Sequence, residues 1–169
     1  MALSLYDASI PLFIRGFDNL SAILEKGRAF ADEKGIPHSE LLEARLIEDM
    51  AALPAQIQRC SDTAKGTAVR VGQVENVAMA DTETSFDDLQ ARIAATVAFL
   101  KAVPAESFEG REDATVTLQT PKGDVPFVAR DYVLGFVLPN FFFHLTTAYA
   151  LLRMKGVPLG KLDYLGTVR

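Results

Sequence analysis

The sequence predicts a mainly α protein: a four-helix bundle with a small β-hairpin inserted before the last helix. Four segments of the 169-residue chain repeat apolar residues at spacings of three and four, which gives each segment one apolar stripe along a helix. Between the third and fourth segments, a short stretch alternates with a period of two, as β-strands do. Four apolar stripes in one small chain bury one another most simply in a bundle. Residues 1–169 are therefore expected to form a single domain with one core.

The first two helices are expected over residues 3–34 and 39–71. Pro11 falls early in the first stripe, where a proline is expected to bend the helix more than end it. Ser39 is an N-cap candidate for the second helix. Pro54 interrupts the second stripe and predicts a kink or a break, because proline removes one helical hydrogen bond and clashes with the preceding turn.

The rest of the chain holds the hairpin and two more helices. The third helix is expected over residues 85–103, beginning at a capping box and ending before a proline. Residues 114–128 contain two alternating stretches joined by turn-forming residues, so this segment is expected to be a β-hairpin. Two strands alone are not stable in water, and the hairpin must lean on the bundle. The fourth helix is expected over residues 130–155, with Gly156 as its C-terminal stop.

Composition favours a soluble cytoplasmic protein without nucleic-acid or membrane partners. The chain has 17 basic and 22 acidic residues, and its net charge of −5 disfavours the phosphate backbone of nucleic acids. One cysteine, Cys60, excludes an internal disulfide and fits a reducing compartment. Residues 132–152 are uncharged and long enough to span a bilayer, but they contain Pro139, Asn140 and His144. A helix buried in the bundle explains the same pattern, and no membrane span is expected.

His144 is the main candidate for a functional side chain, because it lies in the middle of an uncharged, aromatic-rich helix. Helical spacing places Asn140, His144 and Thr147 on one face. A histidine in that position is either a buried hydrogen-bonding group or a ligand. Neither Asn140 nor Ala148, one turn before and one turn after, is a good transition-metal ligand. The other histidine, His38, lies in a connection, so a three-histidine metal site cannot be built within one chain.

Asp49 and Cys60 are the next candidates, both on the predicted second helix. Asp49 lies at the rim of the apolar stripe, where it either turns its carboxylate inward towards His144 or stays exposed to solvent. Cys60 falls on the stripe itself, where a free cysteine is usually an inert buried hydrophobe. The alternative, a Cys60 nucleophile acting with His144, lacks a neighbouring basic group that would lower the pKa of the thiol.

Tyr149 and Arg153 are spaced to lie on one face of the fourth helix, near its C-terminal end. An arginine there stabilises the helix dipole and can pair with Asp163 in the segment that follows. Anchoring of this C-terminal tail is one interpretation of the two residues, and substrate binding is the other. No glycine-rich phosphate loop, zinc-knuckle spacing or serine-elbow motif occurs in the sequence.

The C-terminal part of the chain carries a recognisable pattern. It reads His144-x-x-Thr147-x-Tyr149-x-x-Leu152-Arg153, followed by Gly156-Val157-x-Leu159-Gly160-Lys161-x-Asp163-Tyr164-Leu165-Gly166. The pattern resembles an uncharacterised bacterial family, a domain of unknown function grouped with the DinB/YfiT-like metalloenzymes, and the resemblance extends over nearly the whole chain, including residues 41–46. It implies a four-helix bundle that is often dimeric. Better-known members of the superfamily hold a divalent metal with three histidines, and some are thiol-dependent transferases.

Residue by residue, the resemblance implies a metal site that is degenerate or absent. In the superfamily, one metal-binding histidine comes from the second helix and two come from the fourth. The fourth-helix pair falls on Asn140 and His144 in this sequence, and the second-helix histidine falls near Asp49. Two of the three ligands are thus lost or replaced. His144 and Asp49 are left as the candidate ligands for a divalent metal, and no cofactor is assigned.

Three functional hypotheses follow from these residues. The first is a small-molecule-binding bundle, with or without catalysis, whose pocket lies around His144. The other candidate residues of this pocket are Asn140, Asp49, Thr147, Tyr149 and Arg153. The second hypothesis is a non-catalytic structural or interaction protein that acts as a homodimer. The third is a divalent-metal-dependent hydrolase or thiol transferase. A small-molecule ligand and a second copy of the chain are the expected partners.

Overall fold

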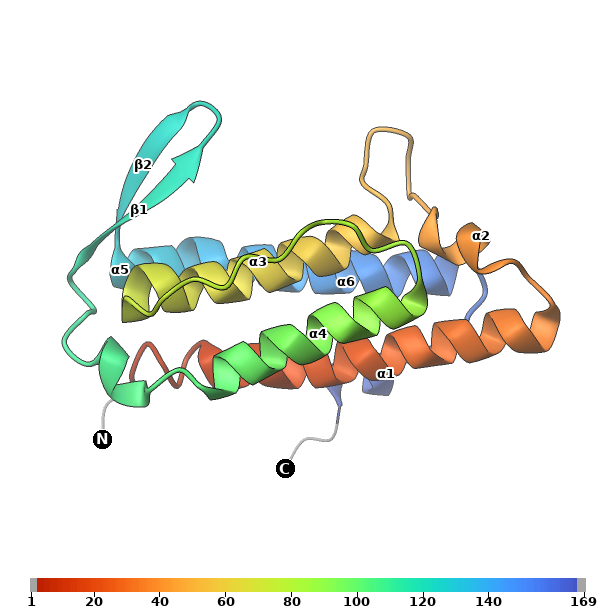
Figure 1. Cartoon of the computed structure of the whole chain (residues 1–169), viewed down its shortest axis with the longest axis horizontal. Coiled ribbons are helices and arrows are strands. Elements are labelled where there is room, and N and C mark those ends of the chain that lie inside the picture. The colour runs from red at the N-terminus through yellow and green to blue at the C-terminus, as the bar shows by residue number, and fades with distance from the viewer. Residues whose placement is uncertain (1–2, 167–169) are drawn as a thin grey trace.

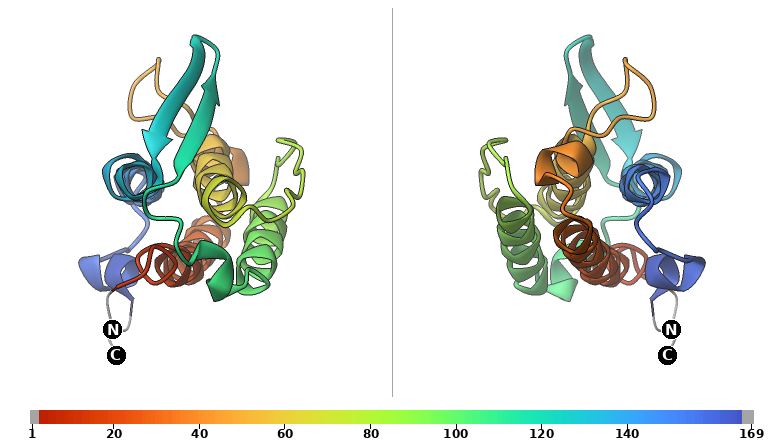
Figure 2. Two further views of the ribbon diagram at one scale, coloured as in Figure 1. Left: turned by 90° about the vertical axis from the view of Figure 1, so that its left-hand side faces the viewer. Right: turned by 90° about the vertical axis from the view of Figure 1, so that its right-hand side faces the viewer.

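The computed structural model describes residues 3–166, and its four long helices pack side by side in a bundle (Figure 1, Figure 2). These helices are α1 (Ile10–Lys34), α3 (Leu53–Gly72), α4 (Phe86–Lys101) and α6 (Leu138–Met154). An antiparallel hairpin of two strands, β1 (Thr115–Thr120) and β2 (Gly123–Val128), precedes the last long helix. The predicted fold class, mainly α with a small hairpin before the last helix, is confirmed.

The directions of the helices explain the long connection between α3 and α4. Figure 1 shows α1 and α6 running in one direction along the bundle and α3 and α4 running in the other. Because α3 and α4 are parallel, the chain returns along the length of the bundle between them, and residues 73–85 make this return alongside α3. Arg92 of α4 holds the connection, since its buried guanidinium pairs with Asp81 at 2.9 Å and with Glu83 at 2.8 Å.

Helix α1 begins at Ile10 and not at residue 3, so the predicted start of this helix is wrong. Residues 5–9 form turns that lead into it. Pro11 lies in the first helical turn, where its missing N–H would have no helical partner in any case. The proline therefore starts the helix and does not bend it. Gly35 ends α1 in a left-handed conformation, with φ of 64°.

The predicted helix over residues 39–71 is wrong in its first half. The structure has a short helix α2 (His38–Leu42), an irregular loop over residues 43–52, and then α3. Pro54 lies in the first turn of α3, so it marks the start of a new helix and not a kink within one. Leu46 is 43% exposed on the loop, which shows that the apolar spacing in this segment does not mark a buried helical face.

Helix α4 and the hairpin form where the sequence predicts them. A reciprocal capping box starts α4: the amide of Asp88 donates to Oγ of Ser85 at 3.1 Å, and the amide of Ser85 donates to Oδ2 of Asp88 at 3.0 Å. The hairpin leans on the bundle through Val116, which is buried, and through Phe127, whose ring packs against that of Tyr132. This contact gives two strands the support that they need.

The predicted helix over residues 130–155 is continuous but not regular. A short α5 (Ala129–Asp131) leads into a π-helical turn (Tyr132–Val137), and α6 follows directly. Pro139 accounts for the wider turn, because a proline inside a regular α-helix clashes with the carbonyl four residues earlier and leaves that carbonyl without a donor. Gly156 ends the helix as predicted, with φ of 92°.

By length and composition alone, the helix Ala129–Met154 is sufficient to cross a membrane. In the structure, one side of this helix packs in the core of the bundle. The buried residues on that side include Val137, Phe141, Leu145 and Leu151. Its apolar side chains therefore have a partner inside the protein, as those of a core helix do.

Two short helices lie outside the predicted elements. A 3-10 helix (Ala105–Phe108) follows α4, and α7 (Lys161–Leu165) follows α6 and packs against α1. Asn19 of α1 donates to the carbonyl of Tyr164 at 2.9 Å and so fixes α7 to the bundle. A helix of five residues has too little apolar spacing to be read from the sequence.

Candidate functional site

His144 lies on the side of α6 that faces α3, and it is only 8% exposed. Its Nδ1 lies 2.8 Å from Oε1 of Gln56, which belongs to the first turns of α3. Gln56 is itself held in place, because its amide nitrogen donates to the carbonyl of Ala51 at 2.8 Å. The amide oxygen of Gln56 therefore accepts a hydrogen bond from His144. This places the imidazole proton on Nδ1 and leaves a lone pair on Nε2.

The imidazole of His144 is neutral at physiological pH. Burial is the main cause that lowers its pKa from 6.5 to about 4, and the positive charge of Arg59 lowers it further. A neutral imidazole with its proton on Nδ1 can accept a hydrogen bond at Nε2 or bind a metal there. Within residues 3–166, no protein group forms a hydrogen bond with this Nε2.

Two hollows share the side chain of Phe143, the neighbour of His144 in the chain, and His144 itself is not among the residues that line them. The ring of Phe143 is exposed and meets the imidazole edge to face, with centroids 5.1 Å apart. The first, here named the mixed hollow, has a volume of about 350 Å³ and is lined by Arg45, Asp49, Met50, Ala51, Gln56, Arg59 and Phe143. The second, the apolar hollow, has a volume of about 430 Å³ and is lined by Leu46, Phe142, Phe143, Thr146, Thr147 and Ala150. Apolar walls with a few placed polar groups are the usual setting for small-molecule binding.

Asn140 and Thr147 share the α3-facing side of α6 with His144, as their spacing requires, but neither forms a hydrogen bond with the imidazole. Asn140 donates to Oγ1 of Thr63 on α3 at 2.7 Å. Thr147 is buried, and its hydroxyl donates to the carbonyl of Phe143 in its own helix at 2.8 Å. Asn140 thus holds α6 to α3, while Thr147 forms part of the wall of the apolar hollow.

Of the two alternatives for Asp49, the structure has the exposed one, and the carboxylate does not turn inward towards His144. Asp49 lies exposed on the loop between α2 and α3, and Gln56 occupies the place opposite His144. The sequence contained a signal for Gln56, which stands on the face of Leu53 and Cys60 at spacings of three and four. A glutamine in a buried stripe needs hydrogen-bond partners, and the partners of Gln56 are the carbonyl of Ala51 and the imidazole of His144. Asp49 keeps a place at the site because it lines the mixed hollow.

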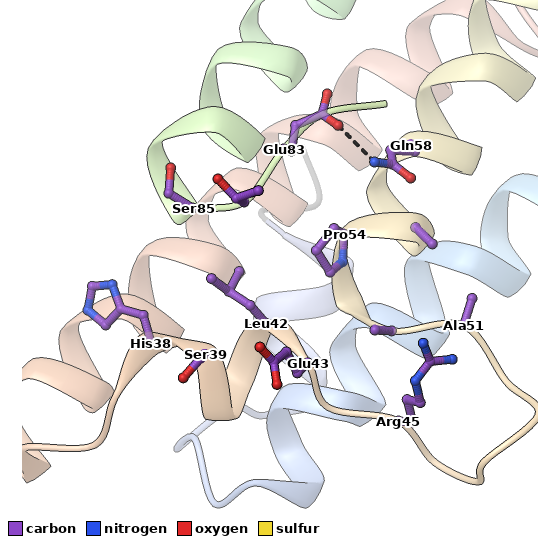
Figure 3. A pocket seen from close by; sticks show the side chains of 13 residues that line it. His38, Ser39, Leu42, Glu43, Arg45, Ala51, Pro54, Gln58, Glu83 and Ser85 are labelled. Carbon is purple, nitrogen blue, oxygen red and sulfur yellow. Dashed lines mark hydrogen bonds between the residues drawn. The ribbon is translucent and has the colours of Figure 1, made fainter. Parts of the chain in front are cut away.

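A larger cavity of about 740 Å³ lies at the end of the bundle next to the mixed hollow (Figure 3). Its walls come from α2, the loop over residues 43–52, the first turns of α3 and the start of α4. Across it, Gln58 donates to Oε2 of Glu83 at 2.8 Å. Arg45 and Ala51 line both this cavity and the mixed hollow. This cavity was not predicted from the sequence, because a continuous helix was expected where the loop forms one wall.

Comparisons with known proteins identify the family that has this fold. Residues 5–165 match the family described as a domain of unknown function, DUF1993. The chain belongs to the DUF1993 family. It is similar to the crystal structure of a DinB family member from Shewanella denitrificans, with 35% sequence identity, a TM-score of 0.89, and coverage of 97% of this chain and 93% of that chain. A comparison with curated proteins gave no match.

The donor groups around His144 in this DUF1993 chain do not fit a firmly held transition metal. The group hydrogen-bonded to the imidazole is the amide of Gln56, and the residue one turn before His144 is Asn140, also an amide; amides are poor ligands for zinc or nickel. In the part of the chain that the structure describes, no three histidine, cysteine, aspartate or glutamate side chains are grouped so as to hold a metal. The arrangement favours hydrogen bonding at Nε2 over metal binding there.

Tyr149 and Arg153 line neither hollow, and they hold the C-terminal tail of the DUF1993 fold. The ring of Tyr149 packs edge to face against that of Tyr164, with centroids 6.0 Å apart. Arg153 donates to a backbone carbonyl just beyond the end of α6. The predicted pair between Arg153 and Asp163 is wrong, because Asp163 pairs with Lys26 of α1 at 2.6 Å.

Cys60 has the environment of an inert thiol. It is fully buried on α3, and its Sγ lies 3.6 Å from the carbonyl oxygen of Phe141. Burial raises the pKa of the Cys60 thiol far above its usual range, so the thiolate is not populated near neutral pH. This environment gives no support to a nucleophile acting with His144.

Proposed function

We propose that this DUF1993 protein binds a small molecule over His144, between α3 and α6. The observation that carries the proposal is the imidazole itself, which is buried, neutral and oriented by Gln56. Among the described residues no protein group hydrogen-bonds to Nε2, so a ligand that donates to this atom would form a hydrogen bond there without displacing a protein partner. The two hollows on either side of Phe143 provide the space for such a ligand.

The linings of the hollows define the chemistry of the ligand. His144 would accept a hydrogen bond from an N–H or O–H group of the ligand. An apolar part of the ligand would lie in the apolar hollow, and a polar part would meet Arg59 and Asp49 in the mixed hollow. The exposed ring of Phe143 stands between these two parts and would cover the bound molecule.

The proposal requires no metal and includes no catalytic step. A divalent-metal-dependent hydrolase or thiol transferase would need several strong ligands beside His144. Gln56 and Asn140 do not supply them, and Asp49 lies on an exposed loop. Binding through hydrogen bonds and apolar contacts uses the groups that are present.

A fragment screen by NMR tests the proposal. Small amides and phenols, each with one N–H or O–H donor, are added to ¹⁵N-labelled protein. We expect the fragments that bind to shift the side-chain amide signal of Gln56 and the imidazole signals of His144. The variant His144→Ala should lose this binding while its circular dichroism stays helical, and the control His38→Ala should bind as the wild type does. Equal binding to His144→Ala, or no binding by any fragment, would contradict the proposal.

Self-association as a homodimer is a second candidate function, favoured by an exposed apolar patch. Leu46, Ile47 and Phe143 are 43%, 62% and 56% exposed, and Leu46 and Phe143 line the same hollow. Large apolar side chains gathered at one place on a surface mark interaction sites. A second copy of the chain would cover this patch and close the mouth of the His144 site, so the two functions are compatible.

We also infer that the protein is soluble and acts in the cytoplasm. Its one cysteine, Cys60, is a buried free thiol, which fits a reducing compartment. The net charge of −5 favours solubility and argues against nucleic acid as a partner.

A further inference from the structure

A polar cleft of about 450 Å³ lies on α3, away from His144. Figure 2 shows the hairpin and the connection of residues 73–85 on either side of this helix, and both contribute walls. The lining residues are Asp62, Lys65, Gly66, Val69, Arg70, Asn76, Thr117 and Gln119. None of them lines the hollows beside His144, and Val69 is the one apolar side chain among them. The cleft is therefore built for a hydrophilic ligand and is separate from the proposed small-molecule site.

Lys65 places a buried positive charge in the cleft. Its side chain is 6% exposed, and its Nζ donates to the carbonyl of Val77 at 3.1 Å and lies 3.5 Å from Oδ1 of Asp62. An ammonium group has three N–H donors, so two protein partners leave one donor for a ligand. A buried ammonium with incomplete partners is costly in the free protein, and an anion would compensate it.

Arg70 adds a second cation, and Gly66 makes room for it. Nη1 of Arg70 donates to the hydroxyl of Tyr132 at 3.1 Å. Among residues 3–166, no acceptor takes the other N–H groups of this guanidinium. A Cβ added at Gly66 would collide with Nη1 of Arg70, so the guanidinium lies folded back over the helix where only glycine leaves space. Glycine is a poor helix former, and its position in the middle of α3 is explained by this contact.

The charges in the cleft favour an anion. Asp62 is its one carboxylate, and Asp62 is already paired with the buried Arg92 at 3.1 Å. The cleft thus has two cations, Lys65 and Arg70, against one carboxylate, which Lys65 shares with Arg92. The other two walls offer the amide of Asn76 and, from alternate positions on one face of β1, the side chains of Thr117 and Gln119.

We propose that this cleft binds the phosphate group of a small phosphate monoester with a hydroxyl-rich body. The planar fork of Arg70 suits two phosphate oxygens, and Lys65 supplies a point charge beside it. A volume of about 450 Å³ exceeds that of a bare phosphate ion, so the amide and hydroxyl groups on the other walls face the body of the ligand. Val69 alone gives too little apolar surface for a lipid chain or an aromatic ring.

Calorimetric titration of the full chain at low ionic strength with glucose 6-phosphate, glucose and inorganic phosphate tests this proposal. The expected result is that glucose 6-phosphate binds more tightly than inorganic phosphate by at least about tenfold and that glucose does not bind. Binding of glucose as tight as that of its phosphate would overturn the anion site. Equal binding of phosphate and glucose 6-phosphate would overturn the claim that the cleft recognises the sugar part of a phosphate ester. If no probe binds, the proposal as a whole is overturned.

Two variants locate the site. Arg70→Gln should weaken the binding of glucose 6-phosphate by about tenfold or more, whereas Arg28→Gln, an exposed arginine of α1 that lines neither this cleft nor the hollows near His144, should leave it unchanged. If Arg70→Gln does not fold, Gly66→Ala takes its place. Its added methyl group displaces the guanidinium and improves the helix, so affinity should fall while the melting temperature stays equal or rises. Wild-type affinity in the variant that folds would overturn the assignment to this cleft.

Discussion

At the scale of single residues, the proposed ligand site depends on three polar groups that are hydrogen-bonded in sequence. The carbonyl of Ala51 accepts from Gln56, and Gln56 accepts from His144, so the backbone at the start of α3 sets the tautomer of an imidazole on α6. The sequence identifies His144 as the residue to explain, because no charged residue surrounds it. It does not identify the partner. Which residue of α3 faces His144 depends on where that helix begins, and Asp49 was one candidate for this place only because the helix was expected to be continuous.

Acid should destabilise the wild-type protein more than His144→Gln. The pKa of His144 falls from 6.5 to about 4 on folding, so between these values the unfolded chain binds more protons than the folded protein does. The stability that this group contributes is therefore present above about pH 6.5 and lost as the pH falls towards about 4. A shift of this size corresponds to about 3 kcal/mol.

Urea unfolding at about pH 7 and about pH 4.5 measures this difference. We expect the free energy of unfolding of His144→Gln to fall less between the two conditions than that of the wild type. The same fall in both proteins would show that His144 is not buried as a neutral group.

At the scale of helices and strands, the sequence predicts which face of a helix is buried better than it predicts the residue at which the helix begins. The apolar stripes of α1 and α3 continue in the sequence beyond the true starts of both helices, and Leu3 and Leu46 are exposed although they fit the spacing. Pro11 was expected to bend a helix and Pro54 to kink or break one, and each lies in a first turn, where proline is tolerated best, so the break is confirmed and the bend is not. The stripe alone cannot distinguish these cases, because only tertiary contacts show where burial stops. The loop between α2 and α3, and the cavity beside it, were missed for this reason.

Arg92 should be the side chain that secures the connection between α3 and α4. Its side chain is 2% exposed and pairs with Glu83, whose side chain is 9% exposed, as well as with Asp62 and Asp81. Arg92→Met would leave Glu83 nearly buried and without its cation, at a cost of about 2–3 kcal/mol. Chemical denaturation measures this loss, and amide hydrogen exchange should quicken first in residues 73–85.

A surface arginine provides the matched comparison for Arg92. Arg130 pairs with Asp113 at 2.6 Å, but both side chains are exposed. Arg130→Met should therefore change the free energy of unfolding by less than about 1 kcal/mol. If both variants lose a similar free energy of unfolding, burial of the Arg92 ion pairs does not increase their contribution to stability.

At the scale of the whole molecule, the four-helix bundle was predictable from the sequence, and the packing of the C-terminal helix α7 against α1 was not. Helix α6 is apolar nearly all round, which predicted its buried position, and a change of period from 3.6 to two predicted the hairpin. The resemblance to a DinB-like domain of unknown function is confirmed over residues 5–165. The packing of α7 on α1 could not be predicted, because Lys26 and Asp163 meet only when the bundle has formed. A single sequence shows no sign of so distant a pair.

The proposed homodimer can be tested by sedimentation. The wild type should sediment as a dimer at about 50 µM, a concentration at which micromolar interfaces are occupied. Phe143→Glu should convert it to a monomer, because the change places a charge in the exposed apolar patch. Leu162→Glu changes a residue of α7 that is even more exposed, at 79%, and should stay dimeric. A monomeric wild type would exclude the dimer. A dimeric Phe143→Glu variant would show that the dimer interface does not include Phe143.

The most direct measurement of the central claim is the ¹⁵N NMR titration of the imidazole of His144. The structure predicts that at neutral pH the proton lies on Nδ1, that Nε2 has the chemical shift of an unprotonated nitrogen, and that the ring titrates with a pKa of about 4. A proton on Nε2, or a titration midpoint at or above 6.5, would contradict the oriented neutral imidazole on which the proposed ligand site depends.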